Sequence, residues 1–207
     1  MKKIFFLILI LFYTNPINAL ELRGSFFQGN LIVGKIDYKS KIFVDKKKIK
    51  VSADGYFVFG LNKDRKNDVF IEVFNNGKTE TIIKKVYKKK YQIQRINGLP
   101  SKKVTPPKEF YKRIKDDNKL IAEARAVASE LTFFSNEFKL PIENKIITGV
   151  YGSQRILNGI PKSPHYGLDF AAKEGTEIKS MLDGIVTLSE ADLYYTDGTI
   201  IFDHGHG

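Results

Sequence analysis

Short β-rich runs separated by turn signals fill the chain from residue 20 to residue 96. Asn75-Asn76-Gly77 is the strongest of these signals, because Asn-Gly accepts positive φ and favours a tight hairpin. The expected strands cover residues 31–36, 42–44, 55–59, 69–74, 79–86 and 91–96. Short strands at this spacing predict a small immunoglobulin-like β-sandwich over residues 20–96.

The spacing of apolar residues along the chain changes after residue 96. Residues 97–107 contain Gly98, Pro100, Pro106 and Pro107 and are expected to form a linker. Apolar residues then recur every three or four positions, which predicts an amphipathic helix over residues 108–138. The positions that carry this period are Leu120, Ile121, Ala124, Val127, Ala128, Leu131 and Phe134.

The C-terminal part returns to a β pattern, with strands expected over residues 145–150, 177–181, 184–188 and 199–203. The last strand runs into a turn at His204-Gly205-His206-Gly207, with no later strand to pair with it. The predicted fold is therefore mainly β with one long helix. It consists of an N-terminal β-sandwich, a helical connector and an incomplete antiparallel β domain over residues 143–207.

The N-terminus has the features of a secretory signal peptide. Lys2-Lys3 precede a run of ten apolar residues from Ile4 to Tyr13, and a helix-breaking stretch follows and ends at Ala19. A bilayer core needs about 20 apolar residues, so this run is too short for a membrane anchor. We predict cleavage of residues 1–19, no stable membrane span afterwards, and export to the periplasm or cell envelope.

The amino-acid composition argues against several classes of protein and several kinds of site. The 207 residues are 43% hydrophobic, which argues against intrinsic disorder. The absence of Cys excludes disulfides, thiolate metal sites, a Cys nucleophile and lipid attachment at a cysteine.

The excess of positive over negative charge is confined to the first half of the chain. Residues 20–103 hold 20 Lys and Arg against 8 Asp and Glu, a net +12, whereas residues 104–207 hold 12 against 15, a net −3. Two interpretations stay open: attraction to an anionic polymer or membrane surface, and a general bias toward Lys. The export signal and the lack of a nucleic-acid-binding motif argue against nucleic acid as a partner.

The candidate chemistry lies between Gly149 and Ala172. His165 and Asp169 are four residues apart, and Pro164 and Gly167 argue against a helix at this point. A turn leading into a strand would bring the imidazole and the carboxylate together, and both are suitable zinc ligands. Two ligands do not define a site, and a surface His beside a capping Asp is the simpler alternative.

The motif His165-Tyr-Gly-Leu-Asp169-Phe resembles that of the lysostaphin-type (LytM-like) zinc metalloendopeptidases, which cut peptide cross-links in bacterial peptidoglycan. Two later segments belong to the same resemblance, Gly175–Ser180 and Asp183–Val186. The flanking segments resemble one exported subgroup, and they are Tyr91–Pro100, Gln154–Pro164 and Asp192–Gly207.

By this resemblance, His165 and Asp169 correspond to two of three zinc ligands. The third ligand and the catalytic His residues of the family belong to later Tyr-x-His and His-x-His motifs, which we expect after Gly207. The present chain would then be an inactive fragment with no catalytic residue of its own. Two His at i and i+2 on a strand share a face, so a metal site at His204 and His206 is a second possibility.

Two further residues and the function of the whole protein each have alternative interpretations. Arg155 and Asn158 either line the substrate groove or order their loop. The alternative to an enzyme is a non-catalytic cell-wall-binding regulator of other wall hydrolases, with peptidoglycan and other cell-envelope proteins as partners. A third hypothesis is a basic polymer-binding protein that acts through residues 20–103.

Overall fold

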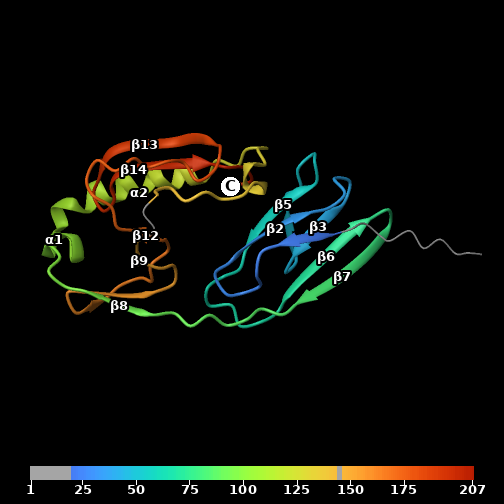
Figure 1. Cartoon of the computed structure of the whole chain (residues 1–207), viewed down its shortest axis with the longest axis horizontal. Helices are drawn as coiled ribbons and strands as arrows, with labels where there is room; N and C mark the ends of the chain where they lie inside the picture. The colour runs from blue at the N-terminus through green and yellow to red at the C-terminus, as the bar shows by residue number, and fades with distance from the viewer. Residues whose placement is uncertain (1–19, 144–145) are drawn as a thin grey trace, which may run out of the picture.

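The structure is a computed structural model that describes residues 20–143 and 146–207 (Figure 1). The predicted signal peptide, residues 1–19, lies outside the described residues. Within the described ranges, no helix is both long enough and apolar enough to cross a membrane.

The described chain is mostly β with one long helix and several small sheets, which confirms the coarse fold class expected from the sequence. The first seven strands are β1 (Glu21–Arg23), β2 (Leu31–Lys35), β3 (Lys41–Val44), β4 (Lys47–Ile49), β5 (Tyr56–Gly60), β6 (Val69–Asn75) and β7 (Lys78–Lys84). The later strands are β8 (Ile93–Ile96), β9 (Ile147–Gly149), β10 (Gln154–Leu157), β11 (Ile160–Pro161), β12 (Asp169–Phe170), β13 (Ile185–Leu193) and β14 (Asp197–Asp203). The helical elements are α1 (Ser101–Val104), α2 (Tyr111–Arg125) and the 3₁₀ turns η1 (Lys108–Phe110) and η2 (Phe133–Ser135).

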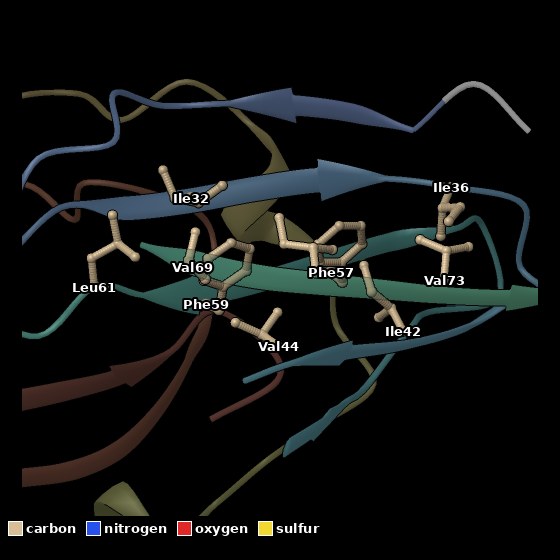
Figure 2. Close-up of a cluster of buried hydrophobic side chains, with 10 residues drawn as sticks. Ile32, Ile36, Ile42, Val44, Phe57, Phe59, Leu61, Val69 and Val73 are labelled. Carbon is tan, nitrogen blue, oxygen red and sulfur yellow. The ribbon is translucent and has the colours of Figure 1, made fainter. Parts of the chain in front are cut away.

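Two antiparallel sheets in the N-terminal half share one hydrophobic core. One sheet has the order β1-β2-β5 and the other β4-β3-β6-β7. Alternate residues of these strands point inward, as the period-2 pattern requires. Figure 2 shows these side chains gathered between the strands. The buried cluster is Ile32, Ile36, Ile42, Val44, Phe57, Phe59, Leu61, Val69, Ile71 and Val73.

Tight turns fix the register of the second of these sheets. Asn76 and Gly77 take positive φ angles of 48° and 73° between β6 and β7, as the Asn-Gly signal predicted. Asp45 and Lys46 do the same between β3 and β4, with φ angles of 50° and 68°.

The strand predicted over residues 91–96 belongs to a different part of the molecule. The sequence grouped it with the sandwich, but β8 pairs in parallel with β10, so that Ile93 lies opposite Gln154. Figure 1 shows β8 at the far end of the chain segment that leaves β7. β8 therefore belongs to neither of the two sheets of the N-terminal half.

The C-terminal half contains three small sheets, of order β11-β10-β8, β12-β9 and β13-β14. Helix α2 lies along the β13–β14 hairpin, with Ala124 buried (Figure 1). The predicted strand over residues 177–181 is wrong. The Lys179 amide donates to the Pro141 carbonyl and the Lys139 amide donates to the Met181 carbonyl, but neither segment is a strand in the described chain.

The predicted helix over residues 108–138 is also too long. A 3₁₀ turn occupies residues 108–110, and α2 ends at Arg125. Beyond it, backbone groups bond to the segment that follows β14 instead of to the preceding helical turn. His206 donates its amide to the Ser129 carbonyl at 3.1 Å, and Phe134 donates to the His204 carbonyl at 3.2 Å. Residues 97–107, expected as a linker, contain the single-turn helix α1.

Candidate metal centre

His165 is held in place through its backbone. Its carbonyl accepts a hydrogen bond of 2.7 Å from the Gly152 amide, and its own amide donates to the Ser153 carbonyl at 2.8 Å. Ser153 is buried and directly precedes β10. These two bonds fix the imidazole beside the start of β10, in a loop that the sequence predicted to be non-helical because of Pro164 and Gly167.

Asp169 is positioned by strand pairing. It opens β12 and lies opposite Gly149 of β9. A Cβ atom at Gly149 would lie 2.4 Å from Oδ2 of Asp169, closer than any real contact. Gly149 is therefore required to leave space for the Asp169 carboxylate.

The two side chains meet, as the sequence predicted. Nε2 of His165 lies 3.0 Å from Oδ1 of Asp169, and the His165 side chain is only 11% exposed. Nε2 is nevertheless buried and forms no hydrogen bond among the described residues, as is the case for both ring nitrogens of His206. Buried polar atoms are normally bonded, so the Nε2 nitrogen of His165 is available to an additional group.

A zinc ion fits this arrangement. Ligand atoms about 2.0–2.1 Å from one tetrahedral zinc lie roughly 3.3 Å apart, close to the separation of these two atoms. Imidazole nitrogen and carboxylate oxygen are both ordinary zinc ligands. Residues 20–143 and 146–207 contain no cluster of three or more His, Asp or Glu that would complete a set. His165 and Asp169 could hold a metal ion, but they are two residues, whereas a catalytic zinc requires three protein ligands.

Arg155 contacts the other oxygen of Asp169. Its guanidinium forms an ion pair with Oδ2, and its Nε donates to Oε1 of Gln94 at 3.3 Å. The Arg155 side chain is 26% exposed. Arg155 therefore orients the carboxylate that faces His165 and also carries a positive charge into the centre.

Asn158 is bonded to Leu99, in the segment that follows β8. Its side-chain amide donates to the Leu99 carbonyl at 2.8 Å, and its Oδ1 accepts from the Leu99 amide at 3.1 Å. Its φ of 48° places it in the left-handed region between β10 and β11. These contacts favour the loop-ordering alternative for Asn158, and its predicted role in substrate binding stays a prediction.

His204 and His206 have separate surroundings. Nδ1 of His204 lies 2.8 Å from the Asp183 carbonyl, and its ring stacks on Phe202 at 5.9 Å. The His206 ring packs against Phe134 at 4.9 Å. Burial, reinforced by the nearby Lys50 ammonium, lowers the pKa of His206. Neither residue belongs to a metal-binding cluster within the part of the chain that the structure describes.

No local pattern in the sequence marks the residues that surround His165. Lys103 of α1, Lys162 and Tyr195 share a cavity with Arg155 and His165. These residues lie up to about ninety positions apart, so no local spacing signals their proximity. A comparison with models of known protein families found no match, and a comparison with curated proteins found no similar protein.

Proposed function

We propose that this protein is a zinc-dependent metalloendopeptidase that cleaves peptide cross-links of bacterial peptidoglycan. The observation that carries the proposal is the buried, unbonded Nε2 of His165 facing Oδ1 of Asp169 at 3.0 Å. These are the two positions whose motif resembles that of the lysostaphin-type family. The proposal includes an exported location, an immunoglobulin-like N-terminal sandwich, and residues 143–207 as the first part of the peptidase domain.

The residues of this chain have distinct tasks in the proposal. His165 and Asp169 hold the zinc ion. Arg155 fixes the Asp169 carboxylate through Oδ2, which leaves Oδ1 directed at His165. When bound, zinc lowers the pKa of a water molecule to about 7 and polarises a peptide carbonyl.

A zinc-competition assay tests the site. We expect weak zinc binding to this chain, because two protein ligands are present. His165→Ala should lower the zinc affinity at least about tenfold. Loss of a residue that only hydrogen-bonds to a metal ligand already lowers metal affinity about 10–100-fold, and the loss of a ligand should cost more. His206→Asn is the matched control and should leave zinc affinity unchanged, since Asn tolerates the φ of 65° at this position. Equal affinity in all three proteins would refute the metal centre.

One observation favours the alternative, a non-catalytic cell-wall-binding regulator. The guanidinium of Arg155 already provides a positive charge for Asp169. If zinc does not bind and the protein still sediments with purified peptidoglycan, the regulator is supported. Hydrolysis is tested separately, by counting new amino termini released from peptidoglycan by this protein and by its His165→Ala variant.

A further inference from the structure

A cavity of about 360 Å³ opens beside His165, where four segments of the C-terminal half meet. Lys103 belongs to α1, Arg155 belongs to β10, Lys162 follows β11, and Tyr195 lies in the turn between β13 and β14. The cavity adjoins the candidate metal centre, because His165 and Arg155 contribute to both.

The lining of this cavity is cationic. Lys103, Arg155 and Lys162 contribute to it, and no Asp or Glu does. Two of these charges have partners outside the lining: Nζ of Lys103 lies 3.3 Å from Oδ1 of Asp197, and Arg155 pairs with Asp169. A cavity with charges of one sign concentrates ligands of the opposite sign.

Lys162 is the cation of this lining whose ammonium group has donors left for a ligand. Its Nζ donates to the Val104 carbonyl at 2.5 Å, which fixes the ammonium at the cavity wall. Among the described residues, no carboxylate forms an ion pair with Lys162. An ammonium group has three donors, so two remain for a ligand.

The side chains that line the cavity could contact a peptide. Tyr166 and Tyr195 line the cavity and are 63% and 51% exposed. Exposed tyrosine rings offer apolar area together with a hydroxyl, which matches the mixed surface of a peptide backbone. A phosphate group is bound best by an arginine whose guanidinium is free to donate two parallel hydrogen bonds. The guanidinium of Arg155 is already paired with Asp169, so the cavity suits a carboxylate better than a phosphate.

We propose that this cavity binds the free carboxylate of a peptide beside His165, with Lys162 as the group that pairs with it. This inference rests on the proposed function and names its substrate class: a peptide that carries a free carboxylate close to the bond to be cut.

Two small peptides test the inference, N-acetyl-alanyl-alanine and its C-terminal amide, which differ by one charge. Binding to the protein is followed by NMR titration in the presence of EDTA, so that no metal contributes. The acid should bind about tenfold tighter than the amide, as expected for a charge-assisted contact. The preference should decrease as salt is added.

Variants at Lys162 identify the group responsible. Lys162→Met should abolish the preference for the acid, and Lys162→Arg should retain it because the positive charge is kept. Lys84→Met, at an exposed position on β7, is the matched control and should behave as the unmodified protein. Equal affinity for acid and amide, or a preference that survives Lys162→Met, would overturn the inference. Inorganic phosphate that binds more tightly than the acid and depends on Lys162 would overturn the assignment to a carboxylate.

Zinc affinity measured on the same variants separates this inference from the proposed function. Lys162→Met should keep zinc affinity, and His165→Ala should lose it while keeping the preference for the acid. If zinc binds and the preference is absent, only the inference fails. If the preference is present and zinc does not bind at His165, only the proposed function fails.

Discussion

Lys50 of the basic N-terminal half forms an ion pair of 2.8 Å with Glu130, in the segment that follows α2. The same ammonium donates to the Ser129 carbonyl at 3.0 Å. Glu130 is 82% exposed, whereas Lys50 is 33% exposed. The contact between the two halves therefore depends more on the shielded carbonyl than on the exposed ion pair.

Substitutions at these two residues should have unequal effects. Glu130→Gln should change the free energy of unfolding by less than about 0.5 kcal/mol, since exposed ion pairs contribute little. Lys50→Met removes the hydrogen bond to Ser129 as well and should cost about 1 kcal/mol. Urea unfolding of both variants measures the difference. A larger loss for Glu130→Gln than for Lys50→Met would show that the ion pair dominates.

Gly149 should be essential for the candidate metal centre. In Gly149→Ala the new methyl group would meet Oδ2 of Asp169 at 2.4 Å and displace the carboxylate. We expect a loss of about 1–3 kcal/mol in stability from overpacking, together with weaker zinc binding. Gly60→Ala is the matched control, because nothing lies within 4 Å of its added Cβ atom. Thermal unfolding and zinc competition on both variants provide the comparison.

Packing of Phe57 against Gly34 should limit substitution in the N-terminal core. A Cβ atom at Gly34 would lie 2.0 Å from Cζ of Phe57, a side chain with no exposed surface. Gly34→Ala should destabilise the protein by about 3 kcal/mol, because the ring has no free volume into which to move. Denaturant unfolding monitored by Tyr fluorescence checks this, and a stability close to that of Gly60→Ala would contradict the packing shown here.

Burial of His206 should make stability depend on pH. Its pKa in the folded protein is lowered, first by burial and then by Lys50, while Glu130, Asp54 and Asp203 act in the opposite direction. The unfolded chain therefore binds a proton at a higher pH than the folded chain. This contribution to stability is complete above the ordinary His pKa of about 6.5 and is lost as the pH falls toward the lowered value.

The variant His206→Asn tests this dependence, because Asn does not titrate and tolerates the φ of 65° at this position. Unfolding free energies measured between pH 7.5 and pH 5 should decrease for the unmodified protein and change less for the variant. Equal slopes for the two proteins would show that His206 is not the group that titrates.

A second loss of stability should appear in stronger acid. Burial raises the pKa of Asp203, but hydrogen bonds from Ser129 and Gly205 outweigh burial and leave the pKa below its ordinary value. The ionised carboxylate thus stabilises the fold above a pH of about 3.9, and that contribution is lost as the pH falls through the lowered pKa. Asp203→Asn should weaken this acid transition in the same titration.

Local signals in the sequence were sufficient for several features. Alternating positions predicted β2, β3, β5 and β6 to within about two residues, because a half-buried strand requires that period. Asn76-Gly77 predicted the β6–β7 hairpin, because few residues accept its backbone angles. Pro164 and Gly167 indicated a loop that would bring His165 to Asp169, and the two side chains are adjacent.

Other features depend on partners that are distant along the chain. β8 resembles any short strand, and its pairing with β10 decides to which half of the molecule it belongs. The apolar period that predicted a helix up to residue 138 continues beyond Arg125, but Ser129 and Phe134 bond to the segment that follows β14 instead. Arg155 and Lys162 acquire their roles from Asp169 and from the cavity beside His165. The sequence alone thus determined the local conformations, whose causes lie within a few residues. The tertiary structure decided strand partners, the end of the helix and the charge around the site, because hydrogen bonds and ion pairs between distant segments determine these.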